Sequence, residues 1–219
     1  MKITYIGHAC FAIEAKDGTR VITDPYDPSV GLAMLPLGAD MITMSHEHHD
    51  HNCEDMIVGK PQIVRGPELA AVGGVTTRAV RSWHDDAQGE KRGANFIRIF
   101  GVDGLKIVHM GDQGCMPDED IMEAVADADV MMIPVGGYYT VDAQGAKAII
   151  ERAKPKCVIP MHFRTKHGNY SAIGNHKAFL AAMNAEDAQA VEAVQFDEDC
   201  APKGLLFMKP EADEVVLNG

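Results

Sequence analysis

The sequence lacks most of the features that mark a disulfide-stabilised, nucleic-acid-binding or membrane protein. Its five cysteines are scattered and form no Cys-x-x-Cys pair, which indicates neither a disulfide framework nor a thiolate zinc site. Lys and Arg number 20 against 32 Asp and Glu, and the net charge of −12 predicts no nucleic-acid partner and no membrane partner. No apolar run is long enough to cross a membrane, and the first residues lack the long apolar region of a signal peptide. We therefore expect a cytoplasmic protein.

The chain does have enough apolar residues for a full core. Hydrophobic residues make up 46% of its 219 residues, which predicts a single domain over residues 1–219. A loop is expected at 25–40, where Pro and Gly are frequent. Short apolar runs predict strands at 2–6, 10–15, 20–23, 41–44, 62–65, 76–80, 95–100, 105–110, 129–135, 156–159, 192–196 and 205–208. Helices are expected at 54–58, 67–72, 118–128, 142–153 and 176–184.

Four of the ten histidines lie between positions 46 and 51, in the stretch Ser-His-Glu-His-His-Asp-His at 45–51. The stretch follows the apolar run 41–44, so a buried strand would hold the loop in place. Imidazole nitrogen and carboxylate oxygen are ligands that suit a borderline divalent cation such as zinc. The alternative is a solvated histidine tract such as an expression tag, but a tag lies at a terminus and not behind a buried strand.

Further candidate ligands stand just past the ends of other predicted strands. Each of them, taken alone, has an ordinary structural interpretation. Functional groups at strand ends on one edge of a sheet converge in space, so we expect them to join the histidine loop in one site. The set is too large for one tetrahedral zinc ion but is sufficient for two ions that share a carboxylate. Its members are His46, His48, Asp50, His51, His84, Asp112 and His162.

Two other residues at strand ends are candidates for a supporting role. His8 follows the first predicted strand, where it could line the site or be an ordinary hydrogen-bonded histidine. Asp24 follows the third predicted strand, where it could orient a metal-bound histidine from behind. The alternative for Asp24 is a turn aspartate before Pro25.

Five segments of the chain carry a resemblance to a known family. They are 3–9 (ITYIGHA), 45–51 (SHEHHDH), 108–112 (VHMGD), 134–140 (PVGGYYT) and 159–162 (IPMH). With these motifs the chain resembles the metallo-β-lactamase superfamily of metal-dependent hydrolases over nearly its whole length. It is most similar to the short branch that includes ascorbate-6-phosphate lactonase-like proteins. The resemblance implies an α/β fold (α+β in some schemes), a four-layer αβ/βα sandwich with the site at one edge of two mixed sheets.

The resemblance also implies two divalent metal ions, Zn²⁺ in the first place, with Mn²⁺ or Fe²⁺ as alternatives. The implied ligands are His46, His48 and His84 for the first ion, Asp50, His51 and His162 for the second, and Asp112 as the bridge. His49 takes a variable position that faces solvent or supports the ligands. The sequence departs from the family pattern at Gln113, where a hydroxyl residue is frequent, and at Asn52 and Cys53, where glycine is common.

This ligand set predicts a hydrolase in which a metal-bridging hydroxide attacks an ester, lactone or phosphoester bond of a small, anionic substrate. Asp50 and Asp112 would hold the ions and take up the proton of the nucleophile. Tyr138 or Tyr139, which follow a Gly-Gly pair, could donate a hydrogen bond to the developing oxyanion. The alternative for this tyrosine pair is packing in the core or at an interface.

Arg164 and Lys166 follow His162 closely and predict a loop that holds the anionic end of the substrate, with a solvated surface loop as the alternative. Two other functions stay open. One is a di-iron redox protein on the same fold, although its motif would place a glutamate where His48 stands, whereas Glu47 lies one position earlier. The other is a non-catalytic metal-binding module. A homo-oligomer also stays open.

Overall fold

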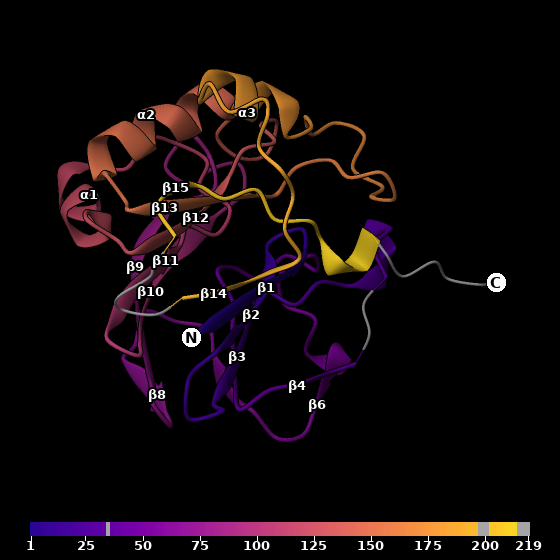
Figure 1. The fold of residues 1–219 in the computed structure, drawn as a ribbon, viewed down its shortest axis with the longest axis vertical. Coiled ribbons are helices and arrows are strands. Elements are labelled where there is room, and N and C mark those ends of the chain that lie inside the picture. Colours follow the sequence, from indigo (N-terminus) through magenta and orange to yellow (C-terminus); the bar gives the residue numbers. More distant parts are fainter. Residues whose placement is uncertain (34–35, 197–201, 214–219) are drawn as a thin grey trace.

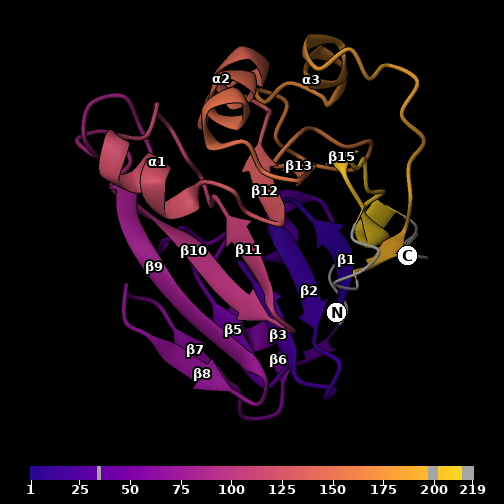
Figure 2. The same cartoon turned by 60° about the vertical axis from the view of Figure 1, so that its left-hand side comes forward.

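Two mixed β-sheets stacked face to face form the framework of the protein. The computed structural model describes residues 1–33, 36–196 and 202–213. The first sheet has six strands in the order β14-β1-β2-β3-β5-β7, and the second has seven in the order β15-β13-β12-β11-β10-β9-β8. Figures 1 and 2 show the three α-helices together on the outer side of the second sheet. The αβ/βα sandwich implied by the sequence resemblance is confirmed.

The first sheet begins with three antiparallel strands, to which two further strands are added in parallel. Its members are β1 (Lys2–Gly7), β2 (Cys10–Glu14), β3 (Arg20–Thr23), β5 (Met41–Thr43), β7 (Gln62–Val64) and β14 (Ala193–Gln195). A separate pair is formed by β4 (Leu37–Gly38) and β6 (Ile57–Val58). The 3₁₀ turns are η1 (Pro28–Val30), η2 (Glu54–Met56) and η3 (Glu211–Asp213).

The outer face of the first sheet is covered by short 3₁₀ turns and loops. A second hydrophobic cluster lies there, separate from the main core, and includes Val30 of η1 and Ala212 of η3. Its other buried members are Ile6, Cys10, Ala12, Ile22, Tyr26, Leu32, Ile42 and Met44. The fourth layer of the sandwich is therefore thin, because it contains no α-helix in the described residues.

The second sheet changes from antiparallel to parallel pairing along its width. Its members are β8 (Ala70–Val72), β9 (Val75–Trp83), β10 (Ala94–Val102), β11 (Leu105–His109), β12 (Val130–Pro134), β13 (Cys157–Met161) and β15 (Gly204–Leu205). The parallel strands β12 and β13 are buried at every residue, as expected for strands covered on both faces.

The helices that cover the second sheet are α1 (Glu119–Val125), α2 (Ala143–Ala153) and α3 (Lys177–Ala182). Aspartate side chains fix the starts of two of them: Asp118 accepts a hydrogen bond from the backbone of Ile121, and Asp142 accepts from two backbone N–H groups. The buried face of α2 consists of Ala143, Ala146, Ile149, Ile150 and Ala153, spaced as one side of a helix.

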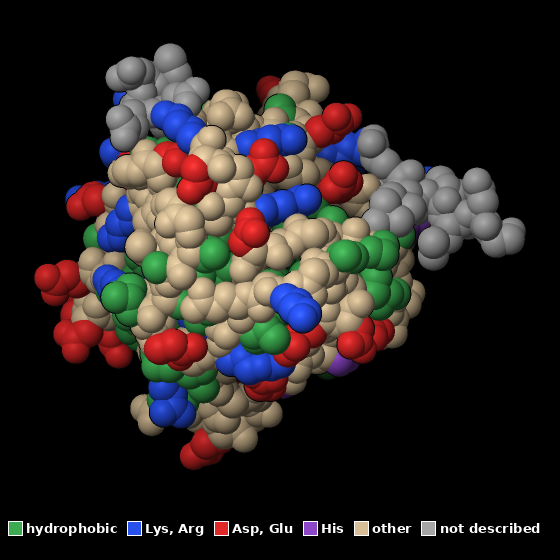
Figure 3. All heavy atoms as spheres, turned by 90° about the horizontal axis from the view of Figure 1, so that it is seen from below, with side chains coloured by type: hydrophobic (Ala, Val, Ile, Leu, Met, Phe, Trp, Pro, Cys, Tyr) green, Lys and Arg blue, Asp and Glu red, His purple; other side chains and the backbone are tan. Residues whose placement is uncertain are grey.

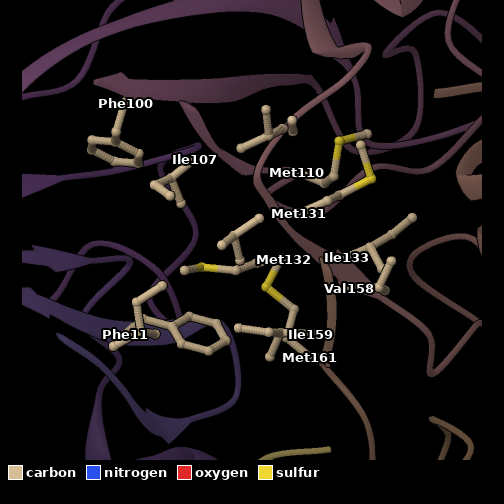
Figure 4. Packing of buried hydrophobic residues seen from close by; sticks show 14 of the residues in the cluster. Phe11, Phe100, Ile107, Met110, Met131, Met132, Ile133, Val158, Ile159 and Met161 are labelled. Atoms are coloured by element: carbon tan, nitrogen blue, oxygen red, sulfur yellow. The ribbon is translucent and has the colours of Figure 1, made fainter. Parts of the chain in front are cut away.

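The main core lies between the sheets and beneath the helices, and methionines fill much of it. Figure 4 shows Met110, Met131, Met132 and Met161 packed among β-branched side chains and aromatic ones, which include Phe11. Unbranched methionine fits irregular gaps between two twisted sheets. The four cysteines in the described residues are free thiols, and Cys200 lies outside those residues, as do positions 34–35 of the expected loop.

Two predicted helices are wrong. The segment 67–72 contains β8, which pairs antiparallel with β9 across Gly73 and Gly74, because this glycine pair forms a two-residue hairpin turn. The segment 54–58 consists of the 3₁₀ turn η2 followed by β6. Cys53 stands at the N-cap of this turn, and its side chain makes no capping hydrogen bond. The other expected elements are present with shifted ends.

The surface mixes charges of both signs, as the face drawn in Figure 3 shows. Within the described residues, none of the helices combines the length and the apolar character that a membrane crossing requires.

A fully buried arginine ties the two sheets together close to the histidine loop. Arg98 of β10 donates hydrogen bonds to the backbone carbonyls of Met44 (2.9 Å), Val64 (3.0 Å) and Gly66 (2.6 Å). These carbonyls belong to the ends of β5 and β7 in the other sheet. Arg98 therefore adds charge-assisted hydrogen bonds between the sheets, one of them to the carbonyl of Val64, which also accepts from the backbone N–H of Met44 (3.0 Å).

The first prediction concerns this bridge. Arg98→Ala should lower the free energy of unfolding by about 3 kcal/mol or more, because it removes three hydrogen bonds from a buried guanidinium and leaves a cavity between the sheets. Arg81→Ala is the matched control: Arg81 is exposed and lies over the ring of Trp83 at 4.8 Å, so its loss should change the free energy by about 0.5–1 kcal/mol. Urea denaturation measures both. Equal effects of the two substitutions would refute the bridging role.

Candidate metal centre

Four loops at one edge of the two sheets bring the predicted ligands together. The loop after β5 carries His46, His48, Asp50 and His51, and the loops after β9, β11 and β13 carry His84, Asp112 and His162. His48 is exposed and Asp50 is partly buried, whereas the other five are buried. The first sheet thus supplies one half of the site, and the second sheet supplies the other half.

Gly111 allows the second half to approach the first. Its φ angle is +57°, and a Cβ atom there would lie 2.6 Å from Cβ of Ser45 and 2.2 Å from Oδ1 of Asn95. Only glycine fits this backbone position. Asn95 then fixes the loop, since its Oδ1 accepts a hydrogen bond from the backbone N–H of Asp112 (3.0 Å).

Asp112 lies at the centre of the cluster. Its Oδ2 atom is 3.3 Å from Nε2 of His51, 3.1 Å from Nε2 of His84 and 3.2 Å from Nε2 of His162. Its Oδ1 atom is buried and has no hydrogen-bond partner among the described residues. A carboxylate in this position can reach ions on either side of it.

Two groups of ligand atoms surround this carboxylate, each with its members within 4.8 Å of one another. One contains His46, His48 and His84, and the other contains His8, Asp50, His51 and His162. These groups correspond to the two ligand sets implied by the sequence, with His8 as an additional member. A third grouping, His46 with His51 and Asp112, connects them.

Hydrogen bonds behind the site fix which nitrogen of each imidazole faces the cluster. Oδ2 of Asp24 accepts from Nδ1 of His51 (2.9 Å) and from Oγ of Ser45 (2.5 Å). Ser45 Oγ in turn accepts from Nδ1 of His46 (2.9 Å). The Nδ1 atom of His84 donates to the backbone carbonyl of Tyr139 (3.1 Å). In all three histidines Nδ1 is therefore engaged, and Nε2 is left as the ligand atom.

Asp24 thus holds the position expected of an orienting carboxylate. It is fully buried, and its Oδ1 also accepts from the backbone N–H of Ser45 (2.8 Å). Nε2 of His46 and Nε2 of His51 are buried without a hydrogen-bond partner in the described residues. Burial and the neighbouring His51 hold the pKa of His46 well below its usual value, so its imidazole is in the neutral form that binds metals.

The charges of the cluster fit a bound cation. Burial lowers the pKa of His51, but the carboxylates of Asp112 and Asp50 outweigh it and hold the pKa well above its usual value. Burial also lowers the pKa of His84, and the hydrogen bond to Asp112 again raises it overall. The carboxylates therefore stabilise positive charge at the place where the imidazole nitrogens converge. A divalent cation supplies more positive charge there than a proton does.

His8 supports Asp50 from a strained backbone position. Its φ angle is +55°, its ring lies 4.2 Å from that of His162, and its backbone carbonyl accepts from Tyr5 Oη (2.8 Å). Burial, and next the charge of His162, lower the pKa of His8 to about 4. Neutral His8 then donates from Nε2 to Oδ2 of Asp50 (3.1 Å).

A cavity of about 280 Å³ opens onto the cluster. It is lined by His48, His49, Asp50, His84, Arg92, Asp112, Tyr139, His162 and Tyr170. Of the tyrosine pair expected near the site, Tyr139 lines the cavity, whereas Tyr138 is 67% exposed and is not part of the lining. Arg164 and Lys166 are exposed and do not line it either; Arg164 donates to the carbonyl of Ser171 (3.2 Å).

Two lining residues were not singled out from the sequence. Tyr170 donates from its hydroxyl to Oδ2 of Asp50 (3.1 Å), and Arg92 lies with its guanidinium carbon 5.3 Å from the ring centre of Tyr139. Tyr170 carries no sequence signal, whereas Arg92 closes a charged stretch that begins right after His84. Gln113, which departs from the family pattern, is buried and donates to the carbonyl of Cys115 (2.8 Å).

Comparisons with known proteins agree with this geometry. The model of the family described as the Beta-lactamase superfamily domain matches residues 2–162. The chain belongs to this superfamily. A UPF0173 metal-dependent hydrolase of Archaeoglobus fulgidus is 30% identical, with 75% of this chain and 84% of that protein covered.

Two solved structures of metal-dependent hydrolases share the fold. A structure from Thermotoga maritima, named as a Zn-dependent hydrolase of the metallo-β-lactamase superfamily, is 30% identical, with a TM-score of 0.78 and coverage of 94% of this chain and 97% of that chain. A metallo hydrolase of Ignicoccus hospitalis has the same fold at 19% identity, with a TM-score of 0.67 and coverage of 90% and 99%. The family places this chain among the metal-dependent hydrolases, and its His and Asp cluster is compatible with a divalent metal.

The second prediction tests the hydrogen bonds behind the site. Ser45→Ala removes the acceptor for Nδ1 of His46 and should weaken divalent-metal binding by about tenfold to a hundredfold. The matched control is Thr43→Val, because the hydroxyl of Thr43 is equally buried on the preceding strand but has no hydrogen-bond partner in the described residues. Competition with a chromogenic chelator measures the affinity. Equal metal affinity in Ser45→Ala and wild type would contradict the orienting role of Ser45.

Proposed function

We propose that this protein hydrolyses an ester, lactone or phosphoester bond of a small substrate with two divalent ions, Zn²⁺ in the first place. The observation that carries the proposal is the position of Asp112 Oδ2 between two groups of ligand atoms, within 3.3 Å of three imidazole nitrogens. A single tetrahedral site would use only half of these ligands.

In the proposed arrangement the first ion is held by three histidines, and the second by one carboxylate and two histidines, with Asp112 shared. The first group is His46, His48 and His84, and the second is Asp50, His51 and His162. Bound divalent ions supply an activated water at neutral pH and polarise the oxygen of the scissile bond. His8, which lies in the second group, donates to Asp50 and is proposed as its support.

The charge of Asp50 and the phenols of the cavity are proposed to hold the cation and stabilise developing charge. Asp50 stays ionised: burial raises its pKa, but His51 and His8 lower it far below the usual value, which suits a ligand of a cation rather than a proton acceptor. Burial, and next Asp50, raise the pKa of Tyr170, which keeps its phenol protonated as a hydrogen-bond donor. Tyr139, on the opposite loop, offers a second phenol at the cavity.

Two observations favour this proposal over its alternatives. A di-iron redox site would require a glutamate at the position of His48, and the neighbouring Glu47 does not replace it, because its carboxylate binds Arg65 (2.6 Å) and Asn52 (3.1 Å) and belongs to neither ligand group. A non-catalytic metal-binding module would need no substrate space, yet a cavity opens directly onto the ligand cluster. Its volume suits a small molecule.

A hydrolysis panel tests the proposed function. Protein loaded with zinc or with manganese is offered lactones, phosphomonoesters, phosphodiesters, carboxylic esters and β-lactams. We expect turnover of at least one ester, lactone or phosphoester that disappears with a chelator and returns with added metal. Absence of metal-dependent turnover across the panel, or a strong ferric absorption band in protein purified without added metal, would refute the proposal.

The third prediction concerns the shared carboxylate. Asp112→Asn should lower the metal content from two ions to one or none and weaken metal binding by more than about a hundredfold, because substitution of a ligand has a larger effect than loss of a residue behind it. The control is His49→Ala, since His49 lines the cavity but belongs to neither ligand group. Elemental analysis after dialysis gives the stoichiometry. Two tightly bound ions in Asp112→Asn, or the loss of an ion in His49→Ala, would show that the ligands are assigned wrongly.

A further inference from the structure

Among the residues that the structure describes, Arg92 is the only Lys or Arg that lines the cavity at the ligand cluster. Its guanidinium carbon lies 5.3 Å from the ring centre of Tyr139, and the backbone carbonyl of Tyr139 accepts from Nδ1 of the ligand His84. Arg92 thus contacts Tyr139, which in turn orients the ligand His84, so Tyr139 alone separates this positive charge from the ligand cluster. Tyr139 and Tyr170 form aromatic walls beside it, with ring centres 6.3 Å apart.

The guanidinium of Arg92 has no carboxylate partner within the described residues and makes no hydrogen bond there. Other arginines of the chain are engaged: Arg65 and Arg152 pair with glutamates, and Arg98 binds three carbonyls. Five hydrogen-bond donors of Arg92 are therefore available at the cavity, held in a planar fork that matches two oxygens of a carboxylate or phosphate.

The loop that carries Arg92 is built around one buried carboxylate. Asp85 follows His84 directly, and both of its oxygens accept hydrogen bonds from backbone N–H groups of the loop, at 2.7–3.0 Å. The donors are Ala87, Gly89, Lys91 and Arg92. Asp85 thus connects the start of the loop, next to the ligand His84, with its end at Arg92.

We infer that Arg92 binds an anionic group of the substrate, a carboxylate or a phosphate, and so sets the specificity of the cavity for small anionic molecules. This inference rests on the proposed hydrolysis and adds the recognition residue to it. A rigid loop that holds an unpaired planar cation at the cavity, beside aromatic walls, presents two-pronged hydrogen bonding at little entropic cost. In this inference Arg92 takes the role that the sequence pattern suggested for Arg164 and Lys166, which lie outside the cavity lining.

Binding of an anion to the metal-loaded protein tests the inference directly. Inorganic phosphate is titrated calorimetrically into wild type and variants of equal metal content. Arg92→Ala should raise the dissociation constant about tenfold to a hundredfold, the loss expected for hydrogen bonds to a charged group. Arg92→Lys, which keeps the charge and loses the fork, should lie between the two. Arg92→Gln serves as a second variant if alanine disturbs the loop.

The controls for this titration are other arginines. Arg81→Ala removes an exposed arginine that also lies over an aromatic ring, and Arg164→Ala removes the competing candidate. Both should bind phosphate as the wild type does. Phosphate held by the metal ions alone would bind with the same affinity in Arg92→Ala and Arg92→Gln, and that result, or an effect confined to Arg164→Ala, would overturn the inference.

A pair of esters separates this inference from the proposed function. With 4-nitrophenyl hydrogen glutarate, Arg92→Ala should raise KM about tenfold or more at nearly unchanged kcat, whereas with neutral 4-nitrophenyl butyrate it should change neither. An equal loss on both esters contradicts anion recognition. If the wild type hydrolyses neither ester, the panel of the preceding subsection decides the proposed function, and the phosphate titration decides the role of Arg92.

Discussion

The carboxylate of Asp112 is buried among three imidazole nitrogens at the junction of the two sheets, and the arrangement of the site follows from the need to balance its charge. An ionised carboxylate so far from water needs compensating positive charge from close by. That compensation comes from the loop after β5 on one side and from the loops after β9 and β13 on the other. Two of the histidines that provide it are themselves oriented, His51 by Asp24 and His84 by the carbonyl of Tyr139. The site is therefore complete only when both sheets are in place.

The two sides of the cavity are built differently. The ligand side stands on strand ends and is fixed by buried hydrogen bonds, which gives the close placement that metal binding needs. The opposite side, with Arg92, Tyr139 and Tyr170, stands farther along the connecting loops, several residues past the strand ends. Loops change readily among related proteins while the strands beneath them stay in place. Substrate specificity is therefore expected to depend on that side of the cavity.

Much of the ligand cluster could be predicted from the sequence, because its residues are tied to strand ends that apolar runs reveal. The histidine loop behind the run 41–44 needed only local pattern, Asp112 follows the mostly buried strand β11, and His162 follows the fully buried strand β13. Tyr170 and Arg92 could not be predicted, since their place at the cavity depends on how loops distant in sequence cross the sheet edge. The strand β8 was missed for another reason: its few apolar residues suit either a helix or a strand, and only the Gly73–Gly74 turn decides between them.

The division of the ligands between the sheets has a consequence for the persistence of the folded chain. An ion held by residues from both sheets would bind the folded chain and not the unfolded one. The equilibrium between folded and unfolded chains would then depend on the concentration of free metal. Above its dissociation constant, each tenfold rise in free ion adds about 1.4 kcal/mol to the stability of the folded state. Loss of the ion would remove this stabilisation and raise the population of locally unfolded chains that proteases can cut. Metal supply would then set the abundance of this protein as well as its activity.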